Sequence, residues 1–256
     1  APRQYSIENT PDPQIMKDDE ILVKVKAMGI CGTDMHIFEG HRKVNFPLVA
    51  GHEVAGHIEK VGPAVKKFKV GDYVTASPNI TCGTCSYCTS GHLNLCPEKV
   101  CMGLDIPGVF SEYIVVPERH LYHLPENITL QQAIAIETAT VSMHGVNRAD
   151  IKIGDNVLFY GAGTVGNYAA QLAKINGANV YVADTNPERL KAVSDLGATV
   201  KTYVSGKDII PRDFFDIVID AAGVAPTISQ ALHNVRKGGK VVFVGIPSKP
   251  IELDVM

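Results

Sequence analysis

The sequence predicts a two-domain α/β protein in which a mostly β domain precedes a doubly wound parallel sheet. The sequence pattern changes near residue 150. Before it, short β-type runs are separated by Gly and Pro, and after it, predicted strands alternate with predicted helices. Such alternation is typical of a parallel sheet with helices on both faces. A length of 256 residues is enough for two packed domains. We therefore expect domains over residues 1–150 and 151–256.

The first domain is predicted from four short β-type runs that long loops connect. These runs cover residues 21–27, 54–61, 72–76 and 113–116. The Gly and Pro residues between them favour turns and loops over helices, so a compact, mostly β domain is expected.

The second domain is predicted from elements that follow one another in a regular order. Residues 157–160 read as a strand, and residues 164–176 carry apolar side chains at helical spacing. A strand over residues 179–183 comes next, followed by Asn186 as a helix N-cap with Pro187 at the first helical position. Further strands are expected over residues 200–204, 216–220 and 240–244, with a helix over residues 226–236.

Composition and charge exclude several classes of function. The formal net charge is −3, so the charge balance does not favour nucleic acid or an anionic membrane surface as a partner. Hydrophobic residues make up 45% and charged residues 20%, as in ordinary soluble proteins. No apolar run approaches the ~20 residues of a membrane span, and no secretory signal peptide is recognised. We therefore expect a cytoplasmic protein that acts on a small molecule.

A glycine-rich turn follows the first strand of the second domain and opens a helix. In this GxGxxG motif, Gly161 permits a tight turn, Gly163 lets a pyrophosphate approach the backbone, and Gly166 allows close packing of helix and sheet. The N-terminus of the helix supplies free N–H groups for phosphates. Because both the strand and the helix are in place, the motif predicts a dinucleotide site.

Asp184, at the end of the second strand, favours NAD as the dinucleotide. A carboxylate there can bind the ribose diol and repels a 2′-phosphate, although it could also be an ordinary turn residue. Arg189 lies close enough to accommodate a 2′-phosphate, so NADP stays open as the alternative.

Four cysteines within fifteen residues have the spacing of a structural zinc site, C-x2-C-x2-C-x7-C. They are Cys82, Cys85, Cys88 and Cys96. Four thiolates complete a tetrahedral shell and leave no position for substrate, so their expected role is to hold a loop with little core of its own. Disulfides are disfavoured because cysteines this close cannot all pair locally without strain. A thiol redox sensor is a weaker alternative, since zinc would occupy the thiolates.

Two further segments carry metal-ligating residue types. Cys31 lies in one of them, and His52 with Glu53 in the other. Alone, each has an ordinary explanation, because a Cys in a glycine turn is commonly a packing residue and a lone His is commonly structural. Combined with the cofactor motif and the four cysteines, they resemble the zinc-containing medium-chain dehydrogenases. The matching segments, in the order of that family, are GICGTDMH, AGHEVAGHIEKVG, VGDYV, CGTCSYC, FSEYIVVP and YGAGTVG.

The resemblance implies a fold and an activity. The family includes alcohol, sorbitol, threonine and sugar-alcohol-phosphate dehydrogenases. It implies a GroES-like, mostly β catalytic domain with a zinc lobe near residues 82–96, followed by a Rossmann domain that binds NAD. The implied reaction moves a hydride from a secondary alcohol or polyol to NAD and gives a ketone or aldehyde. Two zinc ions per chain and a homotetramer or homodimer are implied as well.

The resemblance also implies ligands for a catalytic zinc. Cys31 and His52 match ligand positions, and Glu53 would be a ligand or would exchange with water. Glu137 falls where the alcohol dehydrogenases have a second Cys and the polyol branch has Glu, which favours the polyol and threonine branch. The alternative for Glu137 is a surface acid near the start of a helix. Three protein ligands leave one position open for a substrate oxygen.

The same resemblance assigns supporting roles. Thr33 and His36 match the proton relay of the family, and Asp34 would orient His52 through its other ring nitrogen. The histidines at positions 41, 57 and 233 are interpreted as surface or packing residues. Cofactor contacts are expected at Gly161, Gly163, Val165, Gly166, Asp184, Arg189, Val244 and Gly245.

Three other functions remain to be weighed against this one. A non-catalytic, zinc-stabilised relative that binds nucleotide would have lost the ligands or the relay, whereas both are present here. A zinc-free quinone reductase of the same superfamily would lack the cysteine lobe. An NADP-linked alcohol or threonine dehydrogenase differs only in its cofactor.

Members of the family are about 100 residues longer, with two domains of usual size. The sequence provides five strands for the second domain where the family has a sixth and then returns to the first domain. We therefore expect the cofactor domain to be incomplete in this sequence.

Overall fold

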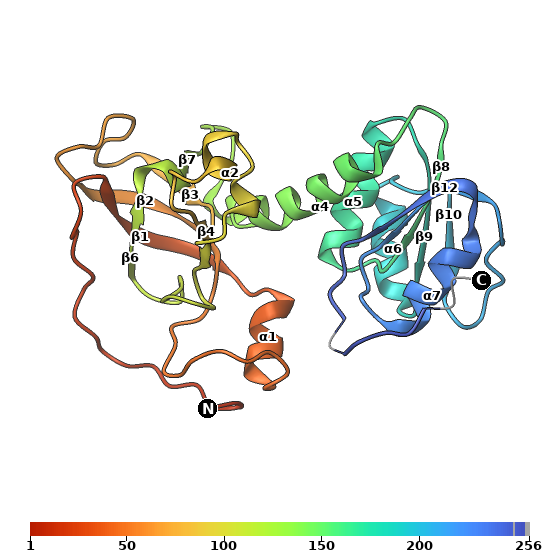
Figure 1. Ribbon diagram of the computed structural model, residues 1–256, viewed down its shortest axis with the longest axis horizontal. Helices are drawn as coiled ribbons and strands as arrows, with labels where there is room; N and C mark the ends of the chain where they lie inside the picture. Colours follow the sequence, from red (N-terminus) through yellow and green to blue (C-terminus); the bar gives the residue numbers. More distant parts are fainter. Residues whose placement is uncertain (248, 254–256) are drawn as a thin grey trace. The chain divides into compact units, whose positions relative to one another are not determined.

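The computed structural model describes residues 1–247 and 249–253, and it divides the chain into two compact units, Ala1–Glu137 and Thr138–Met256. Each unit has a main sheet of its own (Figure 1). Each also has its own hydrophobic core. Within the described ranges, no helix is both long and apolar enough to cross a membrane.

A five-stranded antiparallel sheet forms the first unit, in the order β6-β1-β2-β3-β7. Its strands are β1 (Glu20–Gly29), β2 (Glu53–Val61), β3 (Tyr73–Ala76), β6 (Tyr113–Pro117) and β7 (Leu121–His123). The four runs predicted from the sequence are therefore confirmed as β1, β2, β3 and β6.

Alternating side chains of this sheet make the core of the first unit. Ile21 pairs with Val116 and Val23 with Ile114, and all four are buried in one cluster with side chains of β2 and β3. Burial on one face at every second residue is the expected outcome for a half-buried antiparallel strand.

Several site residues lie on or beside short elements of the first unit that the sequence did not predict. These elements are β4 (Asn79–Ile80), β5 (Val100–Cys101), α1 (Gly32–Phe38), α2 (Ser86–Thr89), α3 (Leu130–Ala133) and the 3-10 helices η1 (Leu93–Leu95) and η2 (Glu118–His120). Elements of two to seven residues are too short to show a hydrophobic period.

The second unit contains a five-stranded parallel sheet in the order β10-β9-β8-β11-β12. Its strands are β8 (Asn156–Tyr160), β9 (Asn179–Asp184), β10 (Lys201–Val204), β11 (Phe215–Asp220) and β12 (Val235–Phe243). The parallel sheet predicted from strand and helix alternation is thus confirmed.

Each face of this sheet has its own core. Val157 and Phe159 of β8 pack in a cluster with buried residues of α4 (Ala135–Ala149), α5 (Thr164–Ile175) and α6 (Pro187–Asp195). Leu158 and Tyr160 belong instead to a cluster that includes Ala231 of α7 (Ala225–Asn234). The sheet is therefore doubly wound, because helices cover both of its faces.

The helix predicted over residues 226–236 ends earlier than expected, at Asn234. The Asn234 side chain accepts a hydrogen bond from the Tyr160 hydroxyl at 2.6 Å and donates one to the carbonyl of Pro211 at 2.7 Å. These buried contacts fix the last turn, and Val235 is already extended and begins β12. The strand predicted over residues 240–244 is correspondingly longer at its start and ends one residue sooner, at Phe243.

The strand order reverses next to β8. From β8 the chain moves outward to β9 and β10 and then crosses to β11 on the other side. Ligands of open α/β sheets bind at the carboxyl ends of the strands on either side of such a reversal. The glycine-rich turn follows β8 directly and therefore lies at this point.

Candidate functional site

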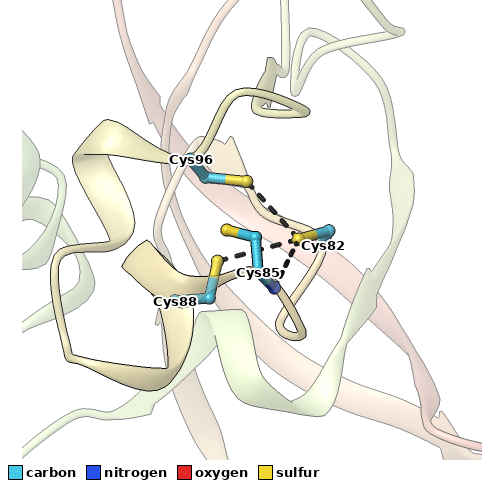
Figure 2. A group of neighbouring side chains, drawn as sticks. All are labelled: Cys82, Cys85, Cys88 and Cys96. Atoms are coloured by element: carbon cyan, nitrogen blue, oxygen red, sulfur yellow. Dashed lines mark hydrogen bonds between the residues drawn. The ribbon is translucent and has the colours of Figure 1, made fainter.

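The four spaced cysteines converge on one point in the first unit. The Sγ atom of Cys82 lies 3.6 Å from that of Cys96 and 3.9 Å from that of Cys88, and all four sulfur atoms lie within 4.8 Å of one another (Figure 2). Sulfur ligands at about 2.3 Å from a tetrahedral zinc are roughly 3.8 Å apart. The sulfurs are also far beyond the roughly 2 Å of a disulfide, and all six cysteines are free thiols.

Backbone N–H groups favour the thiolate form of Cys82, the first of these cysteines. N–H groups of Thr84 and Cys85 point at the Cys82 sulfur, the latter at 3.4 Å, and they lower the pKa of Cys82 to about 6. A thiolate is the form that binds metal. The cluster thus fits a structural zinc ion.

His120 holds the segment that leads into this cluster. Its Nε2 accepts the Thr81 N–H at 3.2 Å, while Arg119 donates to the carbonyl of Thr81 at 2.8 Å. The N–H and the carbonyl of Thr81, the residue before Cys82, are therefore both hydrogen-bonded. Burial, aided by the charge of Arg119, lowers the pKa of His120 to about 4.

The lowered pKa of His120 predicts a loss of stability in acid. The folded state keeps His120 neutral, whereas the unfolded chain binds a proton there below its pKa of about 6.5. The free energy of unfolding is therefore highest above pH 6.5 and falls as the pH drops towards 4. Because one proton is taken up on unfolding, the decrease should reach roughly 3 kcal/mol. Urea unfolding of the chain and of His120→Gln, from neutral pH to pH 4, measures it. Identical pH dependence in the two chains would contradict the prediction.

A second cluster joins two segments far apart in the sequence. Cys31 follows β1 and is the N-cap of α1, His52 directly precedes β2, and Glu53 is the first residue of β2. The pairing of Gly29 with Glu53 places the ends of the two strands together. Ligand atoms of Cys31, His52 and Glu53 lie within 4.8 Å of one another, with His52 and Glu53 buried.

Space for the Glu53 carboxylate depends on Gly29. A Cβ atom on Gly29 would lie 1.9 Å from the Glu53 Oε2, closer than any real contact. Glycine at this position therefore lets the carboxylate stay beside the thiol of Cys31 and the ring of His52.

Asp34 connects the two ligand segments. Its buried carboxylate accepts the N–H of Cys31 at 2.8 Å and the N–H of Gly51 at 3.1 Å. The His52 Nδ1 lies 3.8 Å from the nearer carboxylate oxygen, which is a charge contact rather than a hydrogen bond. Asp34 thus positions the ligands mainly through their backbones, a contact that the sequence analysis did not anticipate.

We expect Asp34→Asn to weaken zinc binding by about 10- to 100-fold, the usual cost of losing such a supporting contact. The substitution replaces one of the two acceptor oxygens with an NH2 group, which would face a backbone N–H. Zinc content at buffered free zinc is the measurement. Asp72→Asn is the matched control, because Asp72 also accepts a backbone N–H, that of Lys69, but belongs to no metal cluster. Equal effects of the two changes would contradict the role of Asp34.

Glu137 interacts electrostatically with this cluster, and Thr33 and His36 lie on the helix that Cys31 caps. Glu137 is half-buried in the first turn of α4, and burial raises its pKa, with His52 opposing and Glu53 adding to the rise. The charges of Glu137 and of the ligand cluster therefore affect each other. Thr33 is half-buried and His36 exposed, both on α1 with Asp34.

The charge of this cluster fits a divalent cation. Burial opposes the protonation of His52, yet a hydrogen bond and the charge of Cys31, together with Asp34 and Glu137, raise the pKa of His52. Buried acidic groups of this kind are usually paired with a cation, bound to a metal ion or neutralised by protonation. A thiol, an imidazole and a carboxylate are also the donor types that zinc takes.

The glycine-rich turn has the geometry that a pyrophosphate requires. Gly161 has a φ of +94°, and a Cβ on Gly166 would lie 1.8 Å from the carbonyl oxygen of Gly161. Gly163 is the N-cap of α5, and a Cβ there would meet nothing within 4 Å. The turn thus has no room for a side chain at Gly166, whereas the space beside Gly163 is open to a ligand.

Asp184 is bound to this turn. Its Oδ2 accepts the Ala162 N–H and its Oδ1 the Asn186 N–H, each at 2.7 Å. The exposed Arg189 lies 4.0 Å from Oδ2. Asn186 caps α6 as predicted, by accepting the Glu188 N–H at 2.8 Å.

The other expected cofactor positions lie at the ends of nearby elements. Val165 is in the first turn of α5, and its carbonyl accepts the Ser142 hydroxyl at 2.9 Å. Val244 and Gly245 follow β12, and their N–H groups donate to the carbonyl of Asp220 at 2.8 and 2.9 Å.

Asp220, at the carboxyl end of β11, is a buried acid that the sequence analysis did not single out. It is completely buried, its Oδ1 accepts the Gly223 N–H at 2.7 Å, and burial raises its pKa. The available signal was an acid that ends the buried run FDIVID directly beside the strand reversal.

Known proteins match both units. The family described as alcohol dehydrogenase GroES-like domain matches residues 17–126, and that described as zinc-binding dehydrogenase matches residues 164–256. Sorbitol dehydrogenase of Bacillus subtilis is 35% identical, over 96% of this chain and 73% of the relative. L-threonine 3-dehydrogenase of Alteromonas mediterranea is 34% identical, over 97% of this chain and 76% of the relative.

Solved structures agree with these relatives. Galactitol-1-phosphate dehydrogenase from Escherichia coli superposes with a TM-score of 0.93 at 28% identity and covers 99% of this chain and 75% of its own. A zinc-binding dehydrogenase from Sinorhizobium meliloti bound to NADP has a TM-score of 0.91 at 30% identity, over 100% of this chain and 78% of its own. The first unit is thus a GroES-like β domain and the second a Rossmann-like domain. The chain belongs to the zinc-type medium-chain alcohol dehydrogenases and is an oxidoreductase that acts on alcohols or polyols.

Proposed function

We propose that this chain oxidises a secondary alcohol or polyol with NAD, using Cys31, His52, Glu53 and Glu137 around a catalytic zinc. The observation that carries the proposal is the half-buried thiol of Cys31 beside the buried imidazole of His52 and carboxylate of Glu53, where β1 ends and β2 begins. Bound there, zinc would lower the pKa of the substrate hydroxyl, and the nicotinamide would accept the hydride.

Side chains of α1 would transfer the proton that the alcohol releases. Thr33 and His36 would carry it to solvent, because His36 is exposed and imidazole commonly acts as a proton shuttle in proteins. Asp34 would hold the two ligand segments together while the proton moves. Glu137 would bind or approach the ion as charge at the site changes.

The four-cysteine cluster would hold a second zinc ion with a structural role. Its thiols close the coordination shell, and the lobe around them has little apolar core apart from Cys96. Two zinc ions per chain would follow. A cytoplasmic location and a homotetramer or homodimer stay predictions of the sequence analysis, which cell fractionation and sedimentation would test.

A substrate panel tests the proposed reaction. Polyols, simple alcohols, threonine and sugar-alcohol phosphates are each mixed with NAD, and reduced cofactor is followed before and after chelation. Turnover with one class that chelation abolishes supports the proposal. No turnover with any class, in a chain that binds two zinc ions and NAD, would overturn it in favour of a non-catalytic relative.

We further propose NAD over NADP, on the position of Asp184. Its carboxylate sits at the end of β9 against the glycine-rich turn, where it would meet a ribose diol and repel a 2′-phosphate. Among related structures one is bound to NADP and another, from Escherichia coli, is complexed with NADH, so both cofactors occur in the family.

Asp184→Asn is expected to shift kcat/KM towards NADP relative to NAD by about 10- to 100-fold, because a charge-assisted hydrogen bond is worth roughly 1.5–3 kcal/mol. Asparagine keeps the size of the side chain and one acceptor for the turn. Arg189→Ala is the companion variant and should leave kcat/KM with NAD nearly unchanged. A higher kcat/KM with NADP in the unaltered chain would refute the preference for NAD.

A further inference from the structure

We propose that His36, Glu39 and His41 form a third metal site, which binds a divalent transition-metal ion reversibly at the surface of the first unit. The ion would be one that accepts imidazole and carboxylate donors, such as Zn²⁺ or Ni²⁺. This site shares no residue with the cysteine cluster or with the Cys31, His52 and Glu53 cluster.

The end of α1 brings the three side chains together. Gly40 has a φ of +79°, its N–H donates to the carbonyl of Ile37 at 3.1 Å, and the His41 N–H donates to the carbonyl of His36 at 2.8 Å. These two bonds are the Schellman motif, in which the chain folds back over the last turn of the helix. In this motif a side chain just after the helix contacts one in its last turn, and both are usually apolar. His41 and His36 occupy these two positions here.

Two imidazoles replace that apolar pair in this chain. The rings of His36 and His41 have centroids 6.0 Å apart, and Nδ1 of His41 lies 3.1 Å from the Glu39 Oε2. One ligand atom of each residue lies within 4.8 Å of the others. Ligands around a tetrahedral zinc are roughly 3.3 Å apart, so small rotations of these exposed side chains complete the geometry.

The surroundings favour a weak, exchangeable ion over a permanent one. All three residues are exposed, so water completes the coordination shell and competes for the ion. The backbone turn is already formed, which reduces the entropy lost when the ligands close on an ion. Imidazole donors select transition metals over Mg²⁺ and Ca²⁺, which prefer oxygen ligands.

Occupancy of this site would inhibit the enzyme, a consequence that rests on the proposed function. His36 is the residue expected to pass the proton to solvent, and a ring nitrogen that binds metal can neither accept nor release a proton. Excess zinc would then slow turnover without removing either of the two tightly bound ions.

Metal titration of the full chain, already loaded with two zinc ions, tests the binding. Zn²⁺ and Ni²⁺ are titrated calorimetrically above the ordinary pKa of histidine, with Mg²⁺ in parallel, into the chain and into His41→Gln and Glu39→Gln. His57→Gln is the matched control, because His57 also lies beside a single carboxylate, Glu59 at 3.5 Å, but belongs to no cluster of three. We expect one additional equivalent of Zn²⁺ or Ni²⁺ and none of Mg²⁺. His41→Gln and Glu39→Gln should weaken it at least about 10-fold, the effect expected when one of three ligands is lost, and His57→Gln should not.

Absence of an additional equivalent, or one that His41→Gln leaves unchanged, would overturn the site. The inhibition is measured separately, as turnover against added zinc, and should be relieved in His41→Gln. Binding without inhibition would overturn the regulatory consequence alone. A chain that never turns over would refute the proposed function, while the calorimetric result would still decide whether the site exists.

Discussion

Replacing Cys31 with serine should remove one of two zinc ions and reduce turnover by about 1000-fold, with the fold unchanged. A serine hydroxyl stays protonated at neutral pH and is a poor zinc ligand, whereas His52 and Glu53 alone do not hold the ion tightly. Metal-assisted polarisation contributes several kcal/mol to such a reaction, and each 1.36 kcal/mol is a factor of ten in rate. Zinc content, turnover on the best substrate of the panel and circular dichroism are the three measurements.

Cys101→Ser is the control for this variant. Cys101 is half-buried and belongs to neither metal cluster, so serine there should leave two zinc ions in place and change turnover by only about twofold. If Cys31→Ser also keeps two zinc ions and full turnover, the assignment of the catalytic ligands is wrong.

Replacing Cys96 with serine should have its main effect on stability. Cys96 is the most buried of the four clustered cysteines, and it follows η1, which closes the lobe. Without its thiolate the other three cannot complete a closed shell, and the zinc that holds the lobe is lost. We expect the melting temperature to fall by roughly 5–10 °C, at about 2–4 °C per kcal/mol for a chain of this size.

Limited proteolysis separates this outcome from a general loss of fold. New cleavage should fall within residues 82–96, while the catalytic zinc stays bound. Chelation of the unaltered chain with a strong chelator should reproduce the same cleavage. An unchanged melting temperature together with two retained zinc ions would show that the cluster does not hold a structural ion.

The strands of both units could be predicted because each carries a local signal. Residues 157–160 are an apolar run directly before a glycine-rich turn, and at the start of the run over residues 21–27 Ile21 and Val23 are buried whereas Leu22 and Lys24 are half-buried. Helix α1 was missed because its seven residues begin with Gly32 and contain only one complete apolar period.

The site was predicted to the extent that its residues are neighbours in sequence. The cysteine spacing and the glycine motif are local, and in the structure the four cysteine sulfurs lie together and the glycine motif opens α5. Glu137 could be proposed only by resemblance, because it is distant in sequence from His52 and no spacing rule relates them. The support of Thr81 by His120 depends on packing between distant segments and leaves no trace in the sequence.

The two N–H groups held by Asp34 have a consequence for how a metal enters. They fasten the Cys31 segment to the Gly51 segment through protein atoms alone, so this link does not depend on a bound ion. An ion would therefore meet ligands that the fold itself holds close together. Replacement of zinc by cobalt or cadmium should therefore proceed in the folded protein, and the metal found there should reflect the supply of ions rather than the history of folding.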